Sequence, residues 1–140
     1  MKTILLIMIG LSSLMFADFT RLNGVVTDNK TSLEWQDDYS DNANAIKRTT
    51  WENAIDYCEA LTLESGGWRL PNIKELQSIL DRSKFNPSLD NTVFTKTQNS
   101  YYWSSTTYVY DSYYAWIVGF NNGYSGNYFK NVSNYVRCVR

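Results

Sequence analysis

The side chains that most often do covalent or acid–base chemistry are scarce in this sequence. It contains no His, and its two Cys are Cys58 and Cys138. Catalysis near neutral pH depends on groups whose pKa can be poised there, most often His, or on a thiol beside a base. We therefore expect no enzymatic activity and no cofactor. Two free, reactive thiols or a mechanism built on carboxylates alone would be the enzymatic alternative.

One short acidic stretch offers oxygen ligands for a cation. Asp37, Asp38, Asp41 and Asn42 lie close together in the sequence, and Ca²⁺ is bound by carboxylate and carbonyl oxygens. The stretch does not have the ligand spacing of a calcium-binding loop. We interpret it as a solvated acidic loop and expect no metal site. A calcium ion near Asp37, Asp38 and Asp41 is the alternative.

The C-terminal third has the composition of a binding surface. Residues 99–140 include nine Tyr, six Ser and six Asn. Tyr provides a large contact area with little side-chain entropy to lose, and Ser and Asn provide adaptable hydrogen bonds. The predicted ligand-binding residues are Tyr108, Tyr110, Tyr113, Tyr114, Tyr124 and Tyr128. The alternative for each is a place in a strand or in the core, where we also expect Trp103 and Trp116.

The N-terminus indicates export. Lys2, an apolar run over residues 4–16 and the small residue Ala17 have the layout of a secretory signal. The run is short for a bilayer span, although an uncleaved anchor is the alternative. We predict a signal peptide over residues 1–17, one periplasmic or extracellular domain over residues 18–140, and no stable membrane insertion after cleavage. In an exported chain the two cysteines predict a Cys58–Cys138 disulfide.

The slightly acidic net charge argues against one class of partner, nucleic acid. Without Lys2, residues 18–140 contain 12 basic and 14 acidic residues, a net charge of −2. Proteins that bind nucleic acid carry a basic face, so we expect no nucleic-acid partner. A glycan or a protein ligand fits this charge and the tyrosine-rich composition better.

The elements that must position these residues follow from periodicity and from turn and cap signals. We predict a hairpin over residues 25–35, one helix from Trp51 with a Thr49–Glu52 capping box, and a second helix with an Asn72–Glu75 box. The second helix should end near residues 81–83. Strands are predicted at 101–106, 113–120 and 134–140, with an Asn-Asn-Gly turn at 121–123. The order predicts an α+β fold, with two helices on an antiparallel sheet of N- and C-terminal strands, closed by a disulfide from the first helix to the final strand.

The segment GGWRLPNIKEL, residues 66–76, resembles a site because it places Arg69 among apolar residues at a helix entrance. Trp68 and Leu70 are expected to face the core. A half-buried charge is usually kept paired, so we predict that Arg69 pairs with Glu75 or Asp81 rather than with a ligand.

Several segments in fixed order resemble a known bacterial family. They are TDNKTSLEWQ, WENAIDYCEAL, GGWRLPNIKEL, YYWSST, AWIVGF and YVRCVR, and they are similar to the Lcl C-terminal-like family, named for the end domain of a collagen-like adhesin. The resemblance implies a C-type-lectin-like fold, related to that of formylglycine-generating enzymes. It also implies a role in recognition, since the named adhesin domain is associated with glycosaminoglycan and host surfaces.

These observations predict an exported recognition or adhesion module that binds a glycan or protein through its Tyr-, Ser- and Asn-rich loops. The first alternative is a structural or assembly domain of a cell-envelope complex. The second is an enzyme related to the formylglycine-generating fold, which would need reactive thiols.

Overall fold

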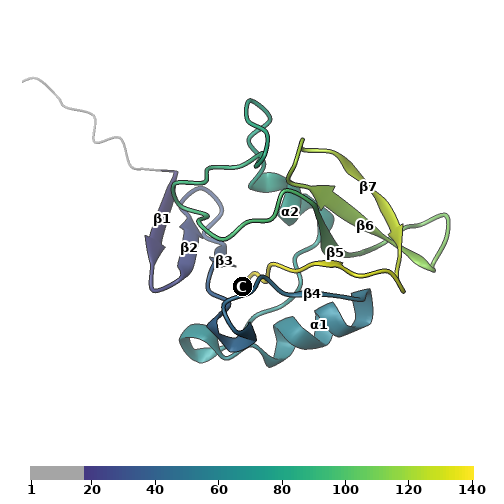
Figure 1. Cartoon of the computed structure of the whole chain (residues 1–140), viewed down its shortest axis with the longest axis horizontal. Coiled ribbons are helices and arrows are strands. Elements are labelled where there is room, and N and C mark those ends of the chain that lie inside the picture. Colours follow the sequence, from purple (N-terminus) through teal and green to yellow (C-terminus); the bar gives the residue numbers. More distant parts are fainter. Residues whose placement is uncertain (1–17) are drawn as a thin grey trace, which may run out of the picture.

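A computed structural model describes residues 18–140, so the predicted signal peptide lies outside the described residues. The described chain forms two β-sheets, two α-helices and two short 3-10 helices, η1 (Ser40–Asn42) and η2 (Leu63–Ser65). Figure 1 shows the smaller sheet at one end of the domain and the larger sheet at the other. No helix within residues 18–140 is long and apolar enough to cross a bilayer.

The smaller sheet contains β1 (Phe19–Leu22), β2 (Val25–Asp28) and β3 (Glu34–Gln36), paired antiparallel in that order. The predicted hairpin of β2 and β3 is confirmed by the pairing of Val26 with Trp35. The first strand, β1, was not predicted from sequence. It joins β2 through Asn23 and Gly24, which both have positive φ, and Asn-Gly is a strong hairpin signal for that reason.

The larger sheet has the strand order β4-β8-β5-β6-β7. Its strands are β4 (Arg48–Thr49), β5 (Tyr101–Thr107), β6 (Tyr114–Gly119), β7 (Ser125–Phe129) and β8 (Asn134–Tyr135). The strands at 101–106 and 113–120 are confirmed, whereas the strand predicted for 134–140 is regular only at Asn134–Tyr135. β5 and β8 pair in parallel, so the sheet is not purely antiparallel as predicted.

The helices are α1 (Trp51–Ala60) and α2 (Ile73–Ser78). The predicted cap of α1 is wrong, because Thr50 is the N-cap and makes no side-chain capping bond. The capping box of α2 is confirmed: Asn72 Oδ1 accepts from the Glu75 backbone N–H at 2.8 Å, and the Glu75 carboxylate accepts from the Asn72 N–H at 2.9 Å. α2 ends at Ser78, earlier than predicted.

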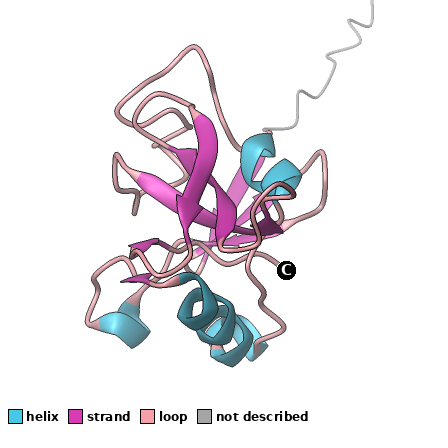
Figure 2. Ribbon diagram, turned by 90° about the vertical axis from the view of Figure 1, so that its right-hand side faces the viewer, coloured by secondary structure: helices cyan, strands magenta, loops and turns pink. Residues whose placement is uncertain are grey.

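The two helices lie on opposite faces of the larger sheet (Figure 2). One core cluster joins Ala54 and Cys58 of α1 to Trp103 and Ile117. The other cluster includes Leu76 of α2 together with Tyr102 and Val118. These two strand residues are the sequence neighbours of Trp103 and Ile117. Successive side chains of a strand point to opposite faces. We call these faces the α1 face and the α2 face.

The predicted disulfide joins Cys58 in α1 to Cys138 near the C-terminus, across 80 residues of sequence. Both cysteines are fully buried in the cluster on the α1 face. The bond ties the first helix to the last segment of the chain, which runs back beside β3, where Gln36 N–H donates to the Cys138 carbonyl at 2.9 Å.

The predicted pairing of Arg69 with Glu75 is confirmed. Both terminal nitrogens of Arg69 donate to the Glu75 carboxylate at 2.6 Å. These hydrogen bonds hold the pKa of the Glu75 carboxyl below its ordinary value. Asp81, the other predicted partner, instead accepts from Ser83 and lies 3.9 Å from the Lys84 ammonium. The Trp-Arg-Leu-Pro segment is therefore a structural corner at the entrance of α2.

The carboxylate of Asp37 is the centre of a buried polar network. Its side chain is fully buried, and it pairs with the guanidinium groups of Arg21 and Arg137. It also accepts from the backbone N–H groups of Thr95 at 2.8 Å and Lys96 at 3.0 Å. One carboxylate thus joins β1, the loop before β5 and the C-terminal segment.

Arg137 is the buried cation opposite this carboxylate. Its side chain is fully buried, and it donates to the carbonyl of Lys96 and to Thr97 Oγ1. Its guanidinium carbon lies 4.8 Å from the ring centroid of Phe94 and 5.8 Å from that of Tyr102. The aromatic rings provide an electrostatically favourable enclosure for the charge.

Replacing Asp37 by Asn should destabilise the protein by about 3–5 kcal/mol, because it removes the negative partner of a buried cation. Urea denaturation measures the change. Asp38→Asn is the matched control: this half-buried neighbour accepts from the Ser40 N–H at 2.8 Å and should cost less than about 1.5 kcal/mol. Equal losses in the two variants would contradict the central role of Asp37.

Removing the disulfide with the double change Cys58→Ala and Cys138→Ala should lower the free energy of unfolding by about 4 kcal/mol. Loop-closure entropy for a loop of this length gives that magnitude. Denaturation of the variant beside the oxidised protein measures the difference. Titration of the unreduced, denatured protein should find no free thiol, and two free thiols would contradict the pairing.

Candidate functional site

The tyrosines predicted as ligand-binding residues lie on two opposite faces of the larger sheet and on one loop. Tyr114 and Trp116 alternate along β6 with Ala115 and Ile117, which belong to the cluster on the α1 face. Tyr114 and Trp116 therefore lie on the α2 face. Tyr128 pairs with Ala115 across the strands and so lies on the α1 face. The structure therefore divides the six predicted residues between these faces and the loop.

Two neighbouring sets of aromatic rings lie on the α2 face of β6 and β7 and on the adjoining loop. We call them together the aromatic patch, and its members are Tyr108, Tyr110, Tyr114, Trp116 and Phe129. Tyr108 contacts both Tyr110 and Trp116 edge to face, with ring centroids 5.5 Å apart in each pair. Tyr114 and Phe129, which pair across β6 and β7, have centroids 5.6 Å apart. The rings thus support one another at the surface.

Trp116 is the central residue of the patch, and the prediction that it lies in the core is wrong. Its side chain is half-buried. Together with Ile73, Lys74 and Gln77 of α2 it lines an open depression of about 260 Å³. Trp103, by contrast, is fully buried as predicted. Alternation along β6 places Trp116 on the α2 face, opposite to Ile117. α2 is the helix that covers this face, so the exposure of Trp116 depends on how far α2 extends over the sheet.

α2 is held over the sheet by polar contacts that also define the depression. Gln77 Nε2 donates to Ser125 Oγ of β7 at 3.0 Å, and the Ile73 N–H donates to Thr106 Oγ1 at 3.0 Å. Gln77 and the exposed Lys74 line the depression together with Trp116. An amide oxygen accepts hydrogen bonds and an ammonium group donates them.

The loop at 108–113 carries the most exposed aromatic side chains of the site. It closes the β5–β6 connection, where the Tyr108 N–H donates to the Tyr114 carbonyl at 2.8 Å, and Figure 1 shows it projecting beyond the strands. Tyr110 is 85% exposed and Tyr113 is 71% exposed. Asp111 fixes the turn by accepting from the Tyr113 N–H at 3.0 Å, so a defined backbone presents these tyrosines.

Tyr124 and Tyr128 lie on the α1 face, away from the aromatic patch. Tyr128 packs on Tyr101, with centroids 5.3 Å apart. The Tyr124 ring lies over Gly126, where an added Cβ would come within 2.5 Å of its Cε1 atom. Gly126 has no side chain, and the Tyr124 ring fills the space above it, as aromatic rings often do beside a glycine in a sheet.

The acidic stretch is not a solvated loop, because Asp37 is buried among its two arginine partners. Asp38 remains half-buried, and a hydrogen bond from the Ser40 backbone lowers the pKa of its carboxyl. Asp41 is exposed and accepts from the Tyr57 hydroxyl at 3.3 Å. Within residues 18–140, no three His, Cys, Asp or Glu side chains come together as a metal site.

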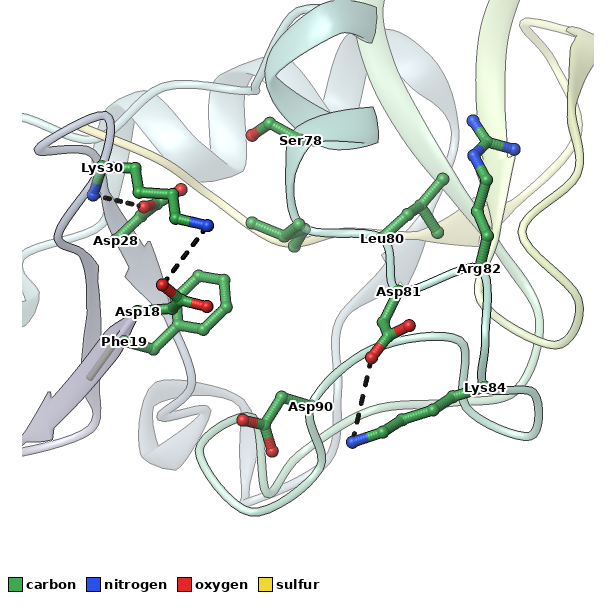
Figure 3. Close-up of a pocket in the computed structure, with 11 residues that line it drawn as sticks. Asp18, Phe19, Asp28, Lys30, Ser78, Leu80, Asp81, Arg82, Lys84 and Asp90 are labelled. Atoms are coloured by element: carbon green, nitrogen blue, oxygen red, sulfur yellow. Dashed lines mark hydrogen bonds and ion pairs between the residues drawn. The ribbon is translucent and has the colours of Figure 1, made fainter. Parts of the chain in front are cut away.

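A larger pocket of about 330 Å³ lies between the β1–β2 hairpin and residues 78–90. Figure 3 shows two ion pairs among its charged side chains. The Lys30 ammonium lies 3.3 Å from the Asp18 carboxylate, and that of Lys84 lies 3.9 Å from Asp81. The buried Asp28 carboxylate accepts from the backbone N–H groups of Lys30 and Thr31, and the one aromatic lining residue, Phe19, packs edge to face on Phe94. The aromatic patch, with several exposed or half-buried rings, is therefore the better candidate site.

The fold and this surface define an α+β domain with one internal disulfide and an aromatic patch on its larger sheet. Residues 24–140 match the family model described as the Lcl C-terminal domain. The chain belongs to this family, as the sequence resemblance indicated. No match is found among curated proteins.

Gly126→Ala should displace the Tyr124 ring and destabilise the protein by about 1 kcal/mol, because a new Cβ meets the ring. Denaturation of the variant measures the loss, and the same change in a Tyr124→Ala background is the control. The penalty should nearly vanish there, since contacting residues couple in such a cycle. If Gly126→Ala destabilises the protein equally in the Tyr124→Ala background, the loss comes from the backbone and not from the Tyr124 ring.

Proposed function

We propose that the protein is an exported recognition module of C-type-lectin-like fold that binds a glycan through its aromatic patch and catalyses no reaction. The observation that carries this proposal is the half-buried Trp116, supported by Tyr108 and bordered by Gln77 and Lys74 in an open depression. An aromatic face can stack on the apolar face of a sugar ring, while adjacent polar groups bond its hydroxyls.

The size and shape of the depression support a ligand that lies along the surface. At about 260 Å³ it is smaller than the usual pocket for a complete small molecule. One sugar ring at Trp116, with neighbouring rings extending toward Tyr110 or Phe129, uses the whole patch. The rings are already packed on one another, so ligand binding orders few side chains and loses little entropy.

Export and the absence of catalysis are supported by the cysteine chemistry. Both cysteines are consumed by the disulfide, and structural disulfides are typical of oxidising compartments. With no His in the sequence, neither a thiol nor an imidazole is present to act as nucleophile or base. The formylglycine-type alternative needs reactive thiols, and a bonded pair does not provide them.

A protein ligand, or a partner subunit in an envelope complex, is the second candidate. The loop at 108–113 favours it, because Val109 is 83% exposed beside Tyr110. An exposed aliphatic residue among tyrosines is more useful in a protein interface than in sugar binding.

Trp116→Ala should lower the affinity for a glycan identified by array screening at least about tenfold, since a central aromatic residue dominates such a contact. Isothermal titration with the purified protein and that glycan measures the change. Tyr108→Ala should weaken binding in the same direction, because Tyr108 supports the Trp116 ring.

Tyr124→Ala is the matched control, because Tyr124 is 58% exposed but lies on the α1 face. It should leave the affinity unchanged, and circular dichroism should show each variant folded. A wild-type protein that binds no glycan, or equal losses in Trp116→Ala and Tyr124→Ala, would refute the glycan site. Binding of a protein partner that depends on Val109 and Tyr110 would establish the second candidate instead.

A further inference from the structure

The outer edge of the larger sheet at β7 lacks the features that protect natural sheet edges. Proteins guard edge strands with charged side chains, proline, shortness or a covering segment. The opposite edge, β4, has two residues and includes Arg48. In the smaller sheet β1 carries Arg21 on the strand itself, as an inward-pointing charge paired with Asp37, and the C-terminal segment covers β3. β7 has five residues, Ser125–Phe129, with no charge and no proline.

The hydrogen-bond register shows which backbone groups of β7 face outward. The Gly119 N–H donates to the Tyr124 carbonyl at 2.7 Å, and the Lys130 N–H donates to the Tyr113 carbonyl at 2.8 Å. Alternate residues of an antiparallel strand bond the same neighbour. The backbone groups of Gly126 and Tyr128 therefore face β6, and those of Ser125, Asn127 and Phe129 face away from the sheet.

These outward groups remain available for a further strand. In the described part of the chain, their only backbone hydrogen bond is from the Val132 N–H to the Phe129 carbonyl, at 2.9 Å. Figure 1 shows β7 as the outermost strand of this sheet. A row of exposed N–H and C=O groups is a template for an extended chain.

Lys130, the cation next to β7, does not guard this edge. Its ammonium lies 3.9 Å from the centroid of the Trp51 ring and 3.0 Å from Thr107 Oγ1. Both contacts draw the side chain onto the α1 face, across β6 from the outer edge. A lysine that could repel an incoming strand is thus held inside its own domain.

We propose that β7 pairs antiparallel with β7 of a second copy of this chain, with Asn127 on the two-fold axis. Asn127 is the middle residue of the strand, and its N–H and C=O both face outward. It would exchange two backbone hydrogen bonds with its counterpart, while Ser125 pairs with Phe129 on each side. The segment is self-complementary because it has no charge to repel its copy.

The Asn127 side chain favours a second copy over an unrelated strand. It is exposed, and an amide offers both a donor and an acceptor, so two such groups facing each other across a two-fold axis bond reciprocally. The joined sheet would have the α2 face of both copies on the same side. Two aromatic patches, each reaching β7 through Phe129, would then border the same junction and could engage one long ligand together.

Sedimentation velocity of the purified protein over a concentration series tests this pairing. The wild type should show a concentration-dependent monomer–dimer equilibrium. Asn127→Pro removes only an outward N–H, which edge strands tolerate, and Asn127→Lys places like charges across the axis. Both should sediment as monomers with an unchanged melting temperature. Asn53→Lys, an exposed position on α1, is the matched control and should still dimerise.

A cysteine cross-link tests the register itself. A hydrogen-bonded antiparallel pair has Cα atoms about 5.5 Å apart, within the range that a disulfide spans. Asn127→Cys should therefore form a covalent dimer on mild oxidation, whereas Asn53→Cys should not. A wild type that is monomeric at every concentration overturns the proposal and leaves β7 to an extended segment of another protein. A dimer that persists in Asn127→Pro and Asn127→Lys overturns it as well.

Discussion

The buried carboxylate of Asp37 is the point at which distant parts of this chain are held together. It accepts hydrogen bonds from Arg137, 100 residues later, and from Thr95, 58 residues later, as well as from Arg21 in β1. A buried charge is tolerated only when its partners are in place. The smaller sheet, the loop before β5 and the C-terminal segment must therefore assemble together, and the disulfide at Cys138 closes next to this network.

Which side chains of the larger sheet reach the surface depends on how the two helices cover it. α1 and α2 cover opposite faces, but α2 has only six residues and leaves part of its face open. The open part contains Trp116, with Tyr108 and Tyr114 beside it. Tyr108 packs edge to face on both Trp116 and Tyr110, so these rings form one surface. The same sheet ends at an uncharged edge strand, so the proposed binding surface and the proposed dimer interface are neighbours.

Local interactions were predictable from sequence, and long-range ones were not. The Asn72–Glu75 capping box and the Arg69–Glu75 pair were correct because each joins residues at most six positions apart. The position of Asp37 was wrong because its burial depends on partners that no local pattern reveals. β1 was missed although Asn23-Gly24 indicates a hairpin, since Arg21 and the exposed Leu22 obscure the alternation of the strand.

The sequence alone determined the chemistry that this protein has available: no imidazole, two cysteines that pair, and a C-terminal third rich in Tyr, Ser and Asn. These are properties of composition and of motifs in fixed order, which also sufficed to indicate the family. Only the tertiary structure decided which aromatic side chains lie together. A strand sends alternate residues to opposite faces, and what covers each face depends on the docking of α1 and α2. For this reason Trp116 joined the surface, whereas Tyr124 and Tyr128 were separated from Tyr108 and Tyr114.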